Sequence, residues 1–444
     1  MVRECKINRV LRVFTCGKEP KISTFKRFLE NSSQKIMNKI FLYTLVVMND
    51  YQFLKFTKAF IDSTDALVRG SRYYTINKET IKSLKWMKKH GLLHNNRKNS
   101  IERTIQKLNK IQEENRDNLE FQEFLDYIFN NLKIYNKNIY RKIPEFEKIM
   151  EEKDINYVSI TFPTAVMMKT KKGRYDFAFN LQEIITDNDI ILTGLLTDKP
   201  NDKNVLPDIM ETLKENFTIL IELQEKYGER RNYKELQHML DNAKFICDSG
   251  YFTDDNLEYM DKNGLKCLIM PKRLSQEINN ELRKKNKIPE KKNKKYKRME
   301  HVHRIKDGFI CEKGHKIELK EVKTIKKRKN IREGIPESWK EHNYIYTCNA
   351  CCKCSNNHLC NFEELKIKTT PLKHEMTNLF TNPEVQDEYQ DRFHSSEFIN
   401  GNHKGNDGTL LLPGHNKTAV QNYTSIINTV FNIFHHKNLK GSIY

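Results

Sequence analysis

The chain has 444 residues, enough for one core with insertions or for two to three domains, and its 10 % aromatic content argues against disorder. Lys and Arg number 78 against 58 Asp and Glu, and the net charge of +20 favours a polyanionic partner such as nucleic acid, although an AT-rich coding bias would give a similar excess. The first residues lead into no apolar stretch, and the longest apolar run, Ile40 to Met48, is too short to cross a bilayer, so we expect neither a signal peptide nor a membrane span.

The first half of the chain predicts a helical region, a strand, inserted helices and a hairpin. Apolar residues at helical spacing favour helices through residues 1–58, and Ala59–Val68 then has the pattern of a strand with a carboxylate inside it. Residues 70–150 are rich in Lys, Glu and Asn and predict helices inserted after that strand. Tyr175–Asp187 and Ile190–Leu196 flank a polar turn and predict a β-hairpin.

Two short buried strands are predicted further along. Leu206 to Phe217 has the spacing of an amphipathic helix, and Phe245–Asp248 predicts a buried strand that ends in a carboxylate. Thr253 is a suitable N-cap for the next helix, and Cys267–Pro271 predicts another buried strand. The succession of strand, hairpin, helix, strand, helix and strand is typical of a mixed α/β fold.

Residues 272–375 predict a second insertion, which is first basic and then rich in cysteine. Its cationic run from Lys284 to Arg298 is interpreted either as a solvated linker or as a sequence-independent contact with phosphates. Residues 376–444 are predicted to be helical. One apolar face of the last helix is expected from Val420, Tyr423, Ile426, Ile427, Val430 and Phe434.

Six of the ten cysteines fall between Cys311 and Cys360. In a chain without a signal peptide we expect thiols or metal ligands rather than disulfides. Cys351 and Cys354 have the spacing with which two thiolates grip one Zn²⁺, so a structural zinc site is one interpretation and a set of reduced, buried thiols is the other. The candidate zinc ligands are Cys311, Cys351, Cys354 and Cys360, with Cys348 as a replacement for Cys311 or Cys360.

Three carboxylates are candidates for binding divalent cations. Asp62 lies in a predicted strand, Asp248 ends another, and Glu397 lies in a predicted helix that can face them. Carboxylates that converge in this way can hold two Mg²⁺ or Mn²⁺ ions for phosphodiester cleavage, whereas a single Asp at a strand end is more often a turn former. Asp65 is the rival of Asp62, and being three residues away it would face the other side of the strand.

Four segments that precede the cysteine cluster resemble motifs of the DDE transposases of bacterial insertion sequences, in the group with a cysteine-containing segment before the last acidic residue. The family writes these motifs I-D-G-T, Y-N-x-Q, N-D…L and A-D-A-G-Y. In this chain the corresponding segments are Ile61–Thr64, Phe179–Gln182, Pro200–Asp202 with Leu206, and Cys247–Tyr251.

The fifth motif is the family's terminal Y, R, E, K signature, which Tyr389, Arg392, Glu397 and Lys404 resemble. The resemblance spans roughly residues 1 to 436. It implies that Asp62, Asp248 and Glu397 are catalytic and bind Mg²⁺ or Mn²⁺, and that Tyr389, Arg392 and Lys404 contact DNA phosphates or end bases.

The resemblance also implies an α/β fold with an RNase H-like mixed sheet core over 59–271, interrupted by the helical insertion 70–150. A helical N-terminal region (1–58), the basic and cysteine-rich insertion (272–375) and C-terminal helices (376–444) would accompany this core. It further implies a transposase that cleaves double-stranded element ends and joins them to target DNA, as a dimer on DNA in the nucleoid of the cytoplasm. Two alternatives stay open, an inactive or noncatalytic zinc- and DNA-binding remnant of a transposase and a nuclease that only hydrolyses.

Overall fold

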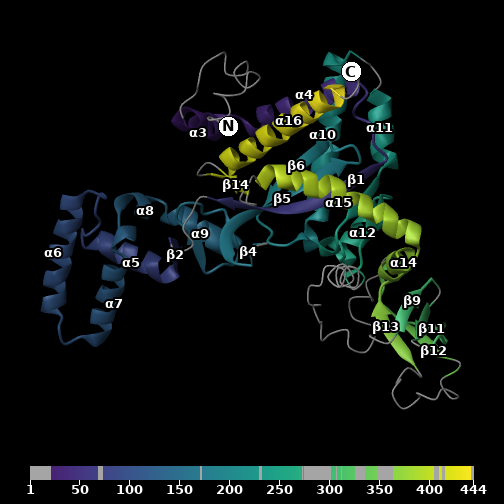
Figure 1. Ribbon diagram of the computed structural model, residues 1–444. Helices are drawn as coiled ribbons and strands as arrows, with labels where there is room; N and C mark the ends of the chain where they lie inside the picture. The colour runs from purple at the N-terminus through teal and green to yellow at the C-terminus, as the bar shows by residue number, and fades with distance from the viewer. Residues whose placement is uncertain are drawn as a thin grey trace. The chain divides into compact units, whose positions relative to one another are not determined.

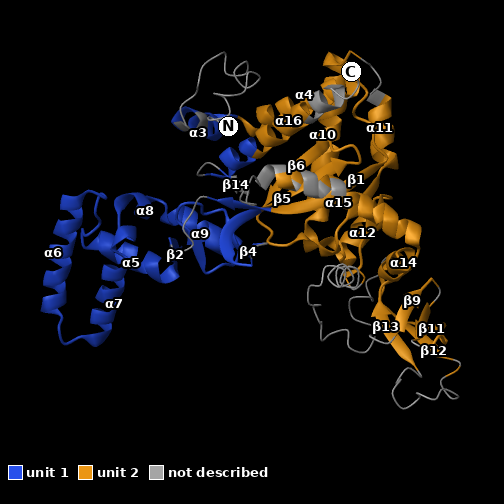
Figure 2. Ribbon diagram, viewed as in Figure 1, with its two compact units in different colours: residues 1–32, 65–179, 411–423 blue, residues 33–64, 180–410, 424–444 orange. Residues whose placement is uncertain are grey.

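The structure is a computed structural model of a mixed α/β protein (Figure 1). It divides into two compact units, one of residues 1–32, 65–179 and 411–423 and the other of residues 33–64, 180–410 and 424–444 (Figure 2). The structure describes residues 22–68, 74–170, 173–229, 233–272, 274, 302–306, 308–311, 313–325, 336–348, 350, 364–404, 410–412 and 416–441.

Helices dominate the first unit, where the sequence predicts inserted helices. Asparagine begins three of them, because the side chains of Asn77, Asn118 and Asn136 accept hydrogen bonds from backbone N–H groups of the first turn. The elements of this unit outside β1 and β5 are α3 (Ile22–Asn31), β2 (Thr75–Asn77), α5 (Lys78–Lys89), α6 (Lys98–Glu114), α7 (Leu119–Asn130), η1 (Leu132–Ile134), α8 (Lys137–Arg141), α9 (Ile143–Glu152), β3 (Tyr157–Ser159) and β4 (Val166–Lys169). The elements from β2 to β3 contribute to one hydrophobic core, and β2 pairs antiparallel with β3.

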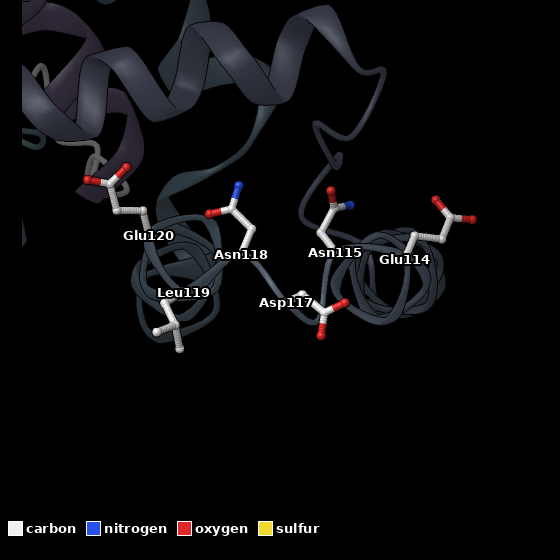
Figure 3. Close-up of a pocket in the computed structure, with 6 residues that line it drawn as sticks. All are labelled: Glu114, Asn115, Asp117, Asn118, Leu119 and Glu120. Atoms are coloured by element: carbon white, nitrogen blue, oxygen red, sulfur yellow. The ribbon is translucent and has the colours of Figure 1, made fainter.

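A hollow opens at the turn between α6 and α7 (Figure 3). Its polar atoms build the turn itself: the Asn118 side chain caps α7, and Gln122 Nε2 donates to the carbonyl oxygen of Asn115 at 2.7 Å. The feature is therefore a helix–helix connection of the first unit.

The second unit is built on a mixed sheet. Its strands, in spatial order, are β6 (Ile191–Thr197), β5 (Tyr175–Thr186), β1 (Lys58–Val68), β7 (Lys244–Cys247) and β8 (Lys266–Ile269). The β5–β6 pair is the antiparallel hairpin that the sequence predicts, and β1, β7 and β8 run parallel to one another. β4 pairs with the first residues of β5, and β14 (Leu410–Leu412) pairs with β1.

Helices of the same unit share one hydrophobic core with this sheet. They are α4 (Gln34–Asp50), α10 (Leu206–Tyr227), α11 (Tyr233–Asn242), η3 (Ser249–Tyr251), α12 (Asp254–Lys262), α14 (Pro371–Leu379), α15 (Pro383–Lys404) and α16 (Lys417–Gly441). The short polar helix η2 (Asp202–Asn204) precedes α10 and has no buried residue. Thr253 caps α12 as predicted, since its side chain accepts from the backbone N–H of Asn256.

Helix α16 covers the edge strand β6 through polar side chains. Asn432 accepts a hydrogen bond from the backbone N–H of Ile191 and donates one to its carbonyl oxygen, both at 3.0 Å. Asn428 lies so close to Gly194 that a Cβ there would stand 2.7 Å from its amide nitrogen. The face that this helix buries is therefore partly polar, in contrast to the predicted apolar face, because Asn432 satisfies backbone groups at the open edge of the sheet.

The cysteine-rich insertion contains a second, antiparallel sheet that the sequence patterns did not predict. Its order is β13 (Leu365–Thr369), β12 (His342–Cys348), β11 (Lys316–Thr324), β10 (Gly308–Cys311) and β9 (Val302–Ile305), with η6 (Glu337–Trp339) before β12. Its small core is formed by Val302, Phe309, Ile317, Tyr344, Tyr346 and Leu365.

His374 of α14 joins that helix to the second sheet. Its ring stacks on Tyr344 with centroids 3.9 Å apart, and Nε2 lies 2.6 Å from the hydroxyl of Tyr346. Burial, with a smaller contribution from the charge of Arg304, lowers the pKa of His374 from 6.5 to about 4. The folded state therefore holds this imidazole neutral in a pH range where the unfolded chain would protonate it.

We expect the second sheet to lose stability as the pH falls from about 6.5 towards 4. In this range His374 is protonated in the unfolded chain but stays neutral in the folded protein, which favours unfolding. Above pH 6.5 this contribution should be constant. The measurement is the thermal midpoint at pH 7 and pH 5, followed by the fluorescence of Trp339 in a Trp86→Phe background. His374→Gln should show a smaller pH-dependent drop, and an equal drop in both proteins would contradict the assignment.

Candidate functional site

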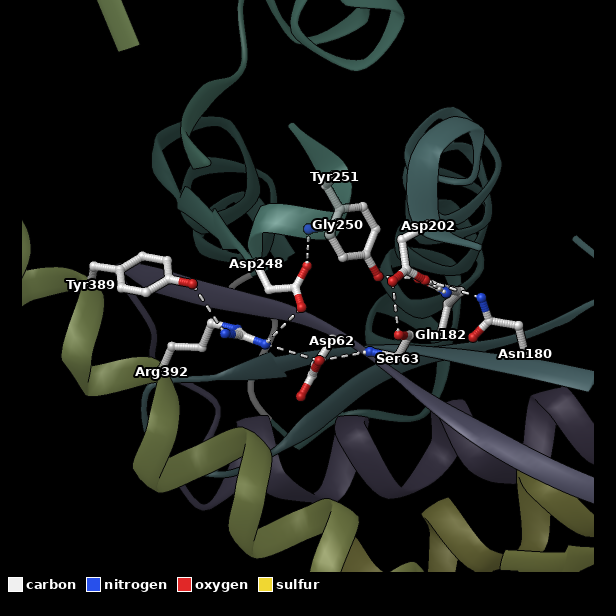
Figure 4. A network of polar contacts seen from close by, with 10 residues as sticks. All are labelled: Asp62, Ser63, Asn180, Gln182, Asp202, Asp248, Gly250, Tyr251, Tyr389 and Arg392. Carbon is white, nitrogen blue, oxygen red and sulfur yellow. Dashed lines mark hydrogen bonds and ion pairs between the residues drawn. The ribbon is translucent and has the colours of Figure 1, made fainter. Parts of the chain in front are cut away.

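Two carboxylates that are distant in sequence meet where the pairing of two adjacent parallel strands stops. The β1–β7 register aligns Ile61 with Cys247, so Asp248 directly follows β7 and Asp62 lies beside it, inside the longer strand β1. Neighbouring parallel strands lie about 4.8 Å apart, so residues at matching positions of the two are close together. The sequence prediction that these two acids lie together is supported by this register (Figure 4).

Arg392 of α15 lies between the two carboxylates. Its Nη2 is 2.9 Å from Oδ1 of Asp62 and 3.8 Å from Oδ2 of Asp248, and its Nη1 donates to the hydroxyl of Tyr389 at 3.2 Å (Figure 4). Arg392 is 6 % exposed and Asp62 8 %, so this ion pair is buried. The guanidinium of Arg392 is therefore the positive charge that the two acids share.

Ion pairs at the other end of the strands anchor α15. Lys58 and Lys244, which face each other in the β1–β7 register, both pair with Glu388, at 3.7 and 2.9 Å. Lys58 also contacts Asp391 at 2.9 Å. These contacts fix the turn of α15 that precedes Arg392.

The site is electrostatically crowded. Burial raises the pKa of Asp248, the charges of Asp62 and Asp202 raise it further, and Arg392 opposes them. Burial acts to lower the pKa of Arg392, but Asp62, Tyr389 and Asp248 outweigh it and raise the pKa above its usual value. The negative charge of the acids thus exceeds what one guanidinium neutralises.

A third carboxylate, Asp202, lies beside this pair. Its Oδ1 accepts hydrogen bonds from Asn180 Nδ2 at 3.0 Å and Gln182 Nε2 at 2.8 Å, and its Oδ2 accepts from Ser63 Oγ at 3.1 Å. Asn180 and Gln182 are two residues apart on β5, so both side chains reach the same face of the sheet. Asp202 precedes α10 in the chain, and these hydrogen bonds hold its carboxylate against β1 and β5.

The turn after Asp248 is shaped by its side chain. Oδ1 of Asp248 accepts from the backbone N–H of Gly250 at 2.5 Å, and the hydroxyl of Tyr251 donates to Oε1 of Gln182. A Cβ at Gly250 would stand 2.8 Å from Asp248 Oδ1 and 2.9 Å from Asp202 Oδ2, so glycine is needed where the two carboxylates approach.

The structure places the predicted site residues as follows. Asp62 and Asp248 come together, and Tyr389 and Arg392 are buried next to them. Glu397 and Lys404 lie in α15, but their side chains are outside the described residues, so their roles stay predictions. The contacts of Asp202, Ser63 and Tyr251 were not predicted, although their segments carry the family motifs.

The oxygen donors of Asp62 and Asp248 suit a hard divalent cation, and the guanidinium of Arg392 is a cation already held by both. Within the described part of the chain, no three His, Cys, Asp or Glu side chains are grouped so that they could hold a metal ion. Asp62 and Asp248 thus provide two carboxylate ligands of the kind that the expected cation needs. Glu397 would have to supply the third ligand.

Of the candidate zinc ligands, only Cys311 and its alternative Cys348 fall within the described residues. Cys311 ends β10 and Cys348 ends β12, and both are partly exposed and pack against the same small core. Cys351, Cys354 and Cys360 lie outside the described residues. The zinc site therefore stays a prediction.

Comparison with protein-family models, curated proteins and solved structures finds no match for this chain. Among the described helices, none combines the length and the apolar character needed to cross a membrane.

Proposed function

We propose that this protein is a DNA transposase of the DDE type, which cleaves the ends of an insertion sequence and transfers them to target DNA with Mg²⁺ or Mn²⁺. The observation that carries the proposal is the meeting of Asp62, inside β1, with Asp248, directly after the parallel strand β7. Two acids that are far apart in the sequence and converge at one place beside a sheet are the arrangement that this chemistry needs.

The sheet supports an RNase H-like core. The two acid-bearing strands, β1 and β7, are inner strands of a mixed sheet in which the β5–β6 hairpin lies on one side and β8 on the other. Helices α10 and α12 lie in the connections from β6 to β7 and from β7 to β8. The proposed catalytic acids thus stand on rigid elements, which keeps their separation constant.

Bound divalent cations would activate the attacking water or 3′-hydroxyl and neutralise the charge that develops on the phosphate. Asp62 and Asp248 would hold them, with Glu397 of α15 as the third ligand. Arg392 binds both acids and thereby docks α15 against them, while Tyr389, on the same helix, accepts a hydrogen bond from its guanidinium. Contacts of Tyr389, Arg392 and Lys404 with DNA would follow a movement of α15.

The proposed partners are the double-stranded element ends and the target, bound in the nucleoid of the cytoplasm. The net charge of +20 supports binding to a phosphate backbone, and such binding should weaken steeply with salt. Because two ends must be cut and joined together, we propose that the protein acts as a dimer on DNA.

We also propose a structural zinc ion, held by Cys311, Cys351, Cys354 and Cys360 or with Cys348 in place of Cys311 or Cys360. The purified protein should contain about one zinc per chain, and Cys311→Ser should lower this content. Cys267→Ser, in β8, is the control that should leave it unchanged. Elemental analysis measures the metal, and a wild-type protein free of zinc would contradict the site.

The proposed function is tested with a linear duplex that carries the DNA flanking the gene, supplied with Mn²⁺ and a target plasmid. We expect nicking at the ends and joining of the 3′ ends to the plasmid, and loss of both in Asp248→Asn. Nicks without joined products would indicate a hydrolytic nuclease instead. Salt-sensitive binding without nicks would indicate a noncatalytic remnant.

A further inference from the structure

Asp202 is the centre of a hydrogen-bond network that extends to both Asp62 and Asp248 (Figure 4). Its two oxygens accept from three side chains, of which Gln182 is fully buried and Asn180 is 6 % exposed. A carboxylate held by three donors on two strands is fixed in one orientation. The position of Asp202 is therefore set by β5 and by Ser63 of β1.

One path of this network leads from Asp202 to Asp62. Ser63 donates its hydroxyl to Oδ2 of Asp202 at 3.1 Å, and its backbone N–H donates to Oδ1 of Asp62 at 2.9 Å. The same residue is thus bound on one side by Asp202 and on the other by Asp62. Loss of the Asp202 carboxylate would release the Ser63 side chain and loosen the backbone that orients Asp62.

The other path leads from Asp202 to Asp248. Gln182 donates to Asp202 and accepts from the hydroxyl of Tyr251, whose own backbone N–H donates to the carbonyl oxygen of Asp248 at 3.2 Å. At Gly250 the two carboxylates approach the same point, at 2.8 and 2.9 Å from the place of a Cβ. The turn that carries Asp248 therefore packs directly against Asp202.

We propose that Asp202 is a positioning residue of the site: it holds Ser63 of β1 and the turn after β7 so that Asp62 and Asp248 keep the separation at which they bind divalent cations. This inference rests on the proposed function. Since Asp202 acts through Ser63 on one acid and through Gln182 and Tyr251 on the other, a change at Asp202 should weaken cation binding and leave DNA binding unchanged.

The test is Mn²⁺ binding to the full chain, measured from the electron paramagnetic resonance signal of free Mn²⁺ without DNA. Asp202→Asn keeps the shape of the side chain but cannot accept from Asn180, Gln182 and Ser63 at once, and it should weaken Mn²⁺ binding by about 10- to 100-fold. The matched control is Asp208→Asn in the first turn of α10, a carboxylate that pairs with Lys199 on the surface and should leave Mn²⁺ binding unchanged.

Ser63→Ala is a second variant that breaks only the path to Asp62, and it should weaken Mn²⁺ binding by less than Asp202→Asn, whereas Ser63→Thr keeps the hydroxyl and should restore it. Thermal unfolding and salt-dependent DNA binding, both expected to stay near wild type in Ser63→Ala, separate positioning from a general loss of structure. If Asp202→Asn fails to fold, Ser63→Ala decides alone.

The role of Asp202 is overturned if Asp62→Asn abolishes Mn²⁺ binding while Asp202→Asn, or Ser63→Ala where the former does not fold, binds Mn²⁺ as tightly as the wild type. Wild-type Mn²⁺ binding in both Asp62→Asn and Asp248→Asn would instead overturn the proposed function and the role of Asp202 with it. The two failures are thus distinguished by the same titrations.

Discussion

Asp62→Asn is expected to reduce Mn²⁺-dependent cleavage by about a thousandfold or more, equivalent to about 4 kcal/mol of transition-state stabilisation. The amide keeps the shape of the side chain and the hydrogen bond to Ser63, but it removes the charge that Arg392 now faces and that a divalent cation would need. The rate of nick formation on an end-bearing duplex measures the effect.

Asp65→Asn is the matched control, because Asp65 lies on the same strand only three residues further on. Asp62 is buried against Arg392, whereas the side chain of Asp65 is half-exposed. We expect Asp65→Asn to cleave at close to the wild-type rate. If Asp65→Asn were inactive while Asp62→Asn remained active, Asp65 and not Asp62 would be the catalytic acid, and the proposed site would be refuted.

Five strands of the large sheet could be predicted, because apolar or alternating runs bounded by turn residues mark them. The hairpin was placed within one residue: Asp187–Asp189 gives the turn, and Asp189 adopts a positive φ of 62° that Asp tolerates. The proximity of Asp62 and Asp248 could also be predicted. Each acid follows a short buried run, and the two runs form neighbouring parallel strands that bring the acids together.

The second sheet could not be predicted in the same way. β11 has the sequence KIELKEVKT, and of its nine residues only Ile317 is buried, so its pattern resembles that of a solvated segment. Its pairing with β12 is set by a core of few residues, contributed by all five strands. Such a sheet is stabilised by contacts between segments, which no local spacing reveals.

The role of Asp202 was missed for a related reason. Its partners Ser63, Asn180 and Gln182 lie between 20 and 139 residues away in the chain. Asp202 stands just before a helix, where a carboxylate is ordinarily explained as a cap. The resemblance to the family motifs includes Asp202 without assigning it a role, and only the folded sheet brings its side chain next to Ser63 of β1 and the turn after β7.

Arg392→Leu is expected to destabilise the metal-free protein by about 3 kcal/mol, because it leaves the carboxylates of Asp62 and Asp248 without their buried counter-charge. A divalent cation could replace that charge. We therefore expect Mn²⁺ to raise the unfolding midpoint of Arg392→Leu by more than it raises that of the wild type, in which the cation must compete with the guanidinium. Urea unfolding in EDTA measures the loss of stability without metal, and urea unfolding in Mn²⁺ measures the stabilisation by the cation.

Two variants separate the charge from the docking of α15. Arg392→Lys keeps a positive charge but loses the planar fork, and its Mn²⁺ response should lie between those of the wild type and Arg392→Leu. Lys244→Leu removes an ion pair between β7 and Glu388 of α15 without touching the acids, so it should lower stability while leaving the Mn²⁺ response as in the wild type. Equal stabilisation of the wild type and Arg392→Leu by Mn²⁺ would mean that the cation binds away from Asp62 and Asp248, because a cation between these carboxylates has to displace Arg392.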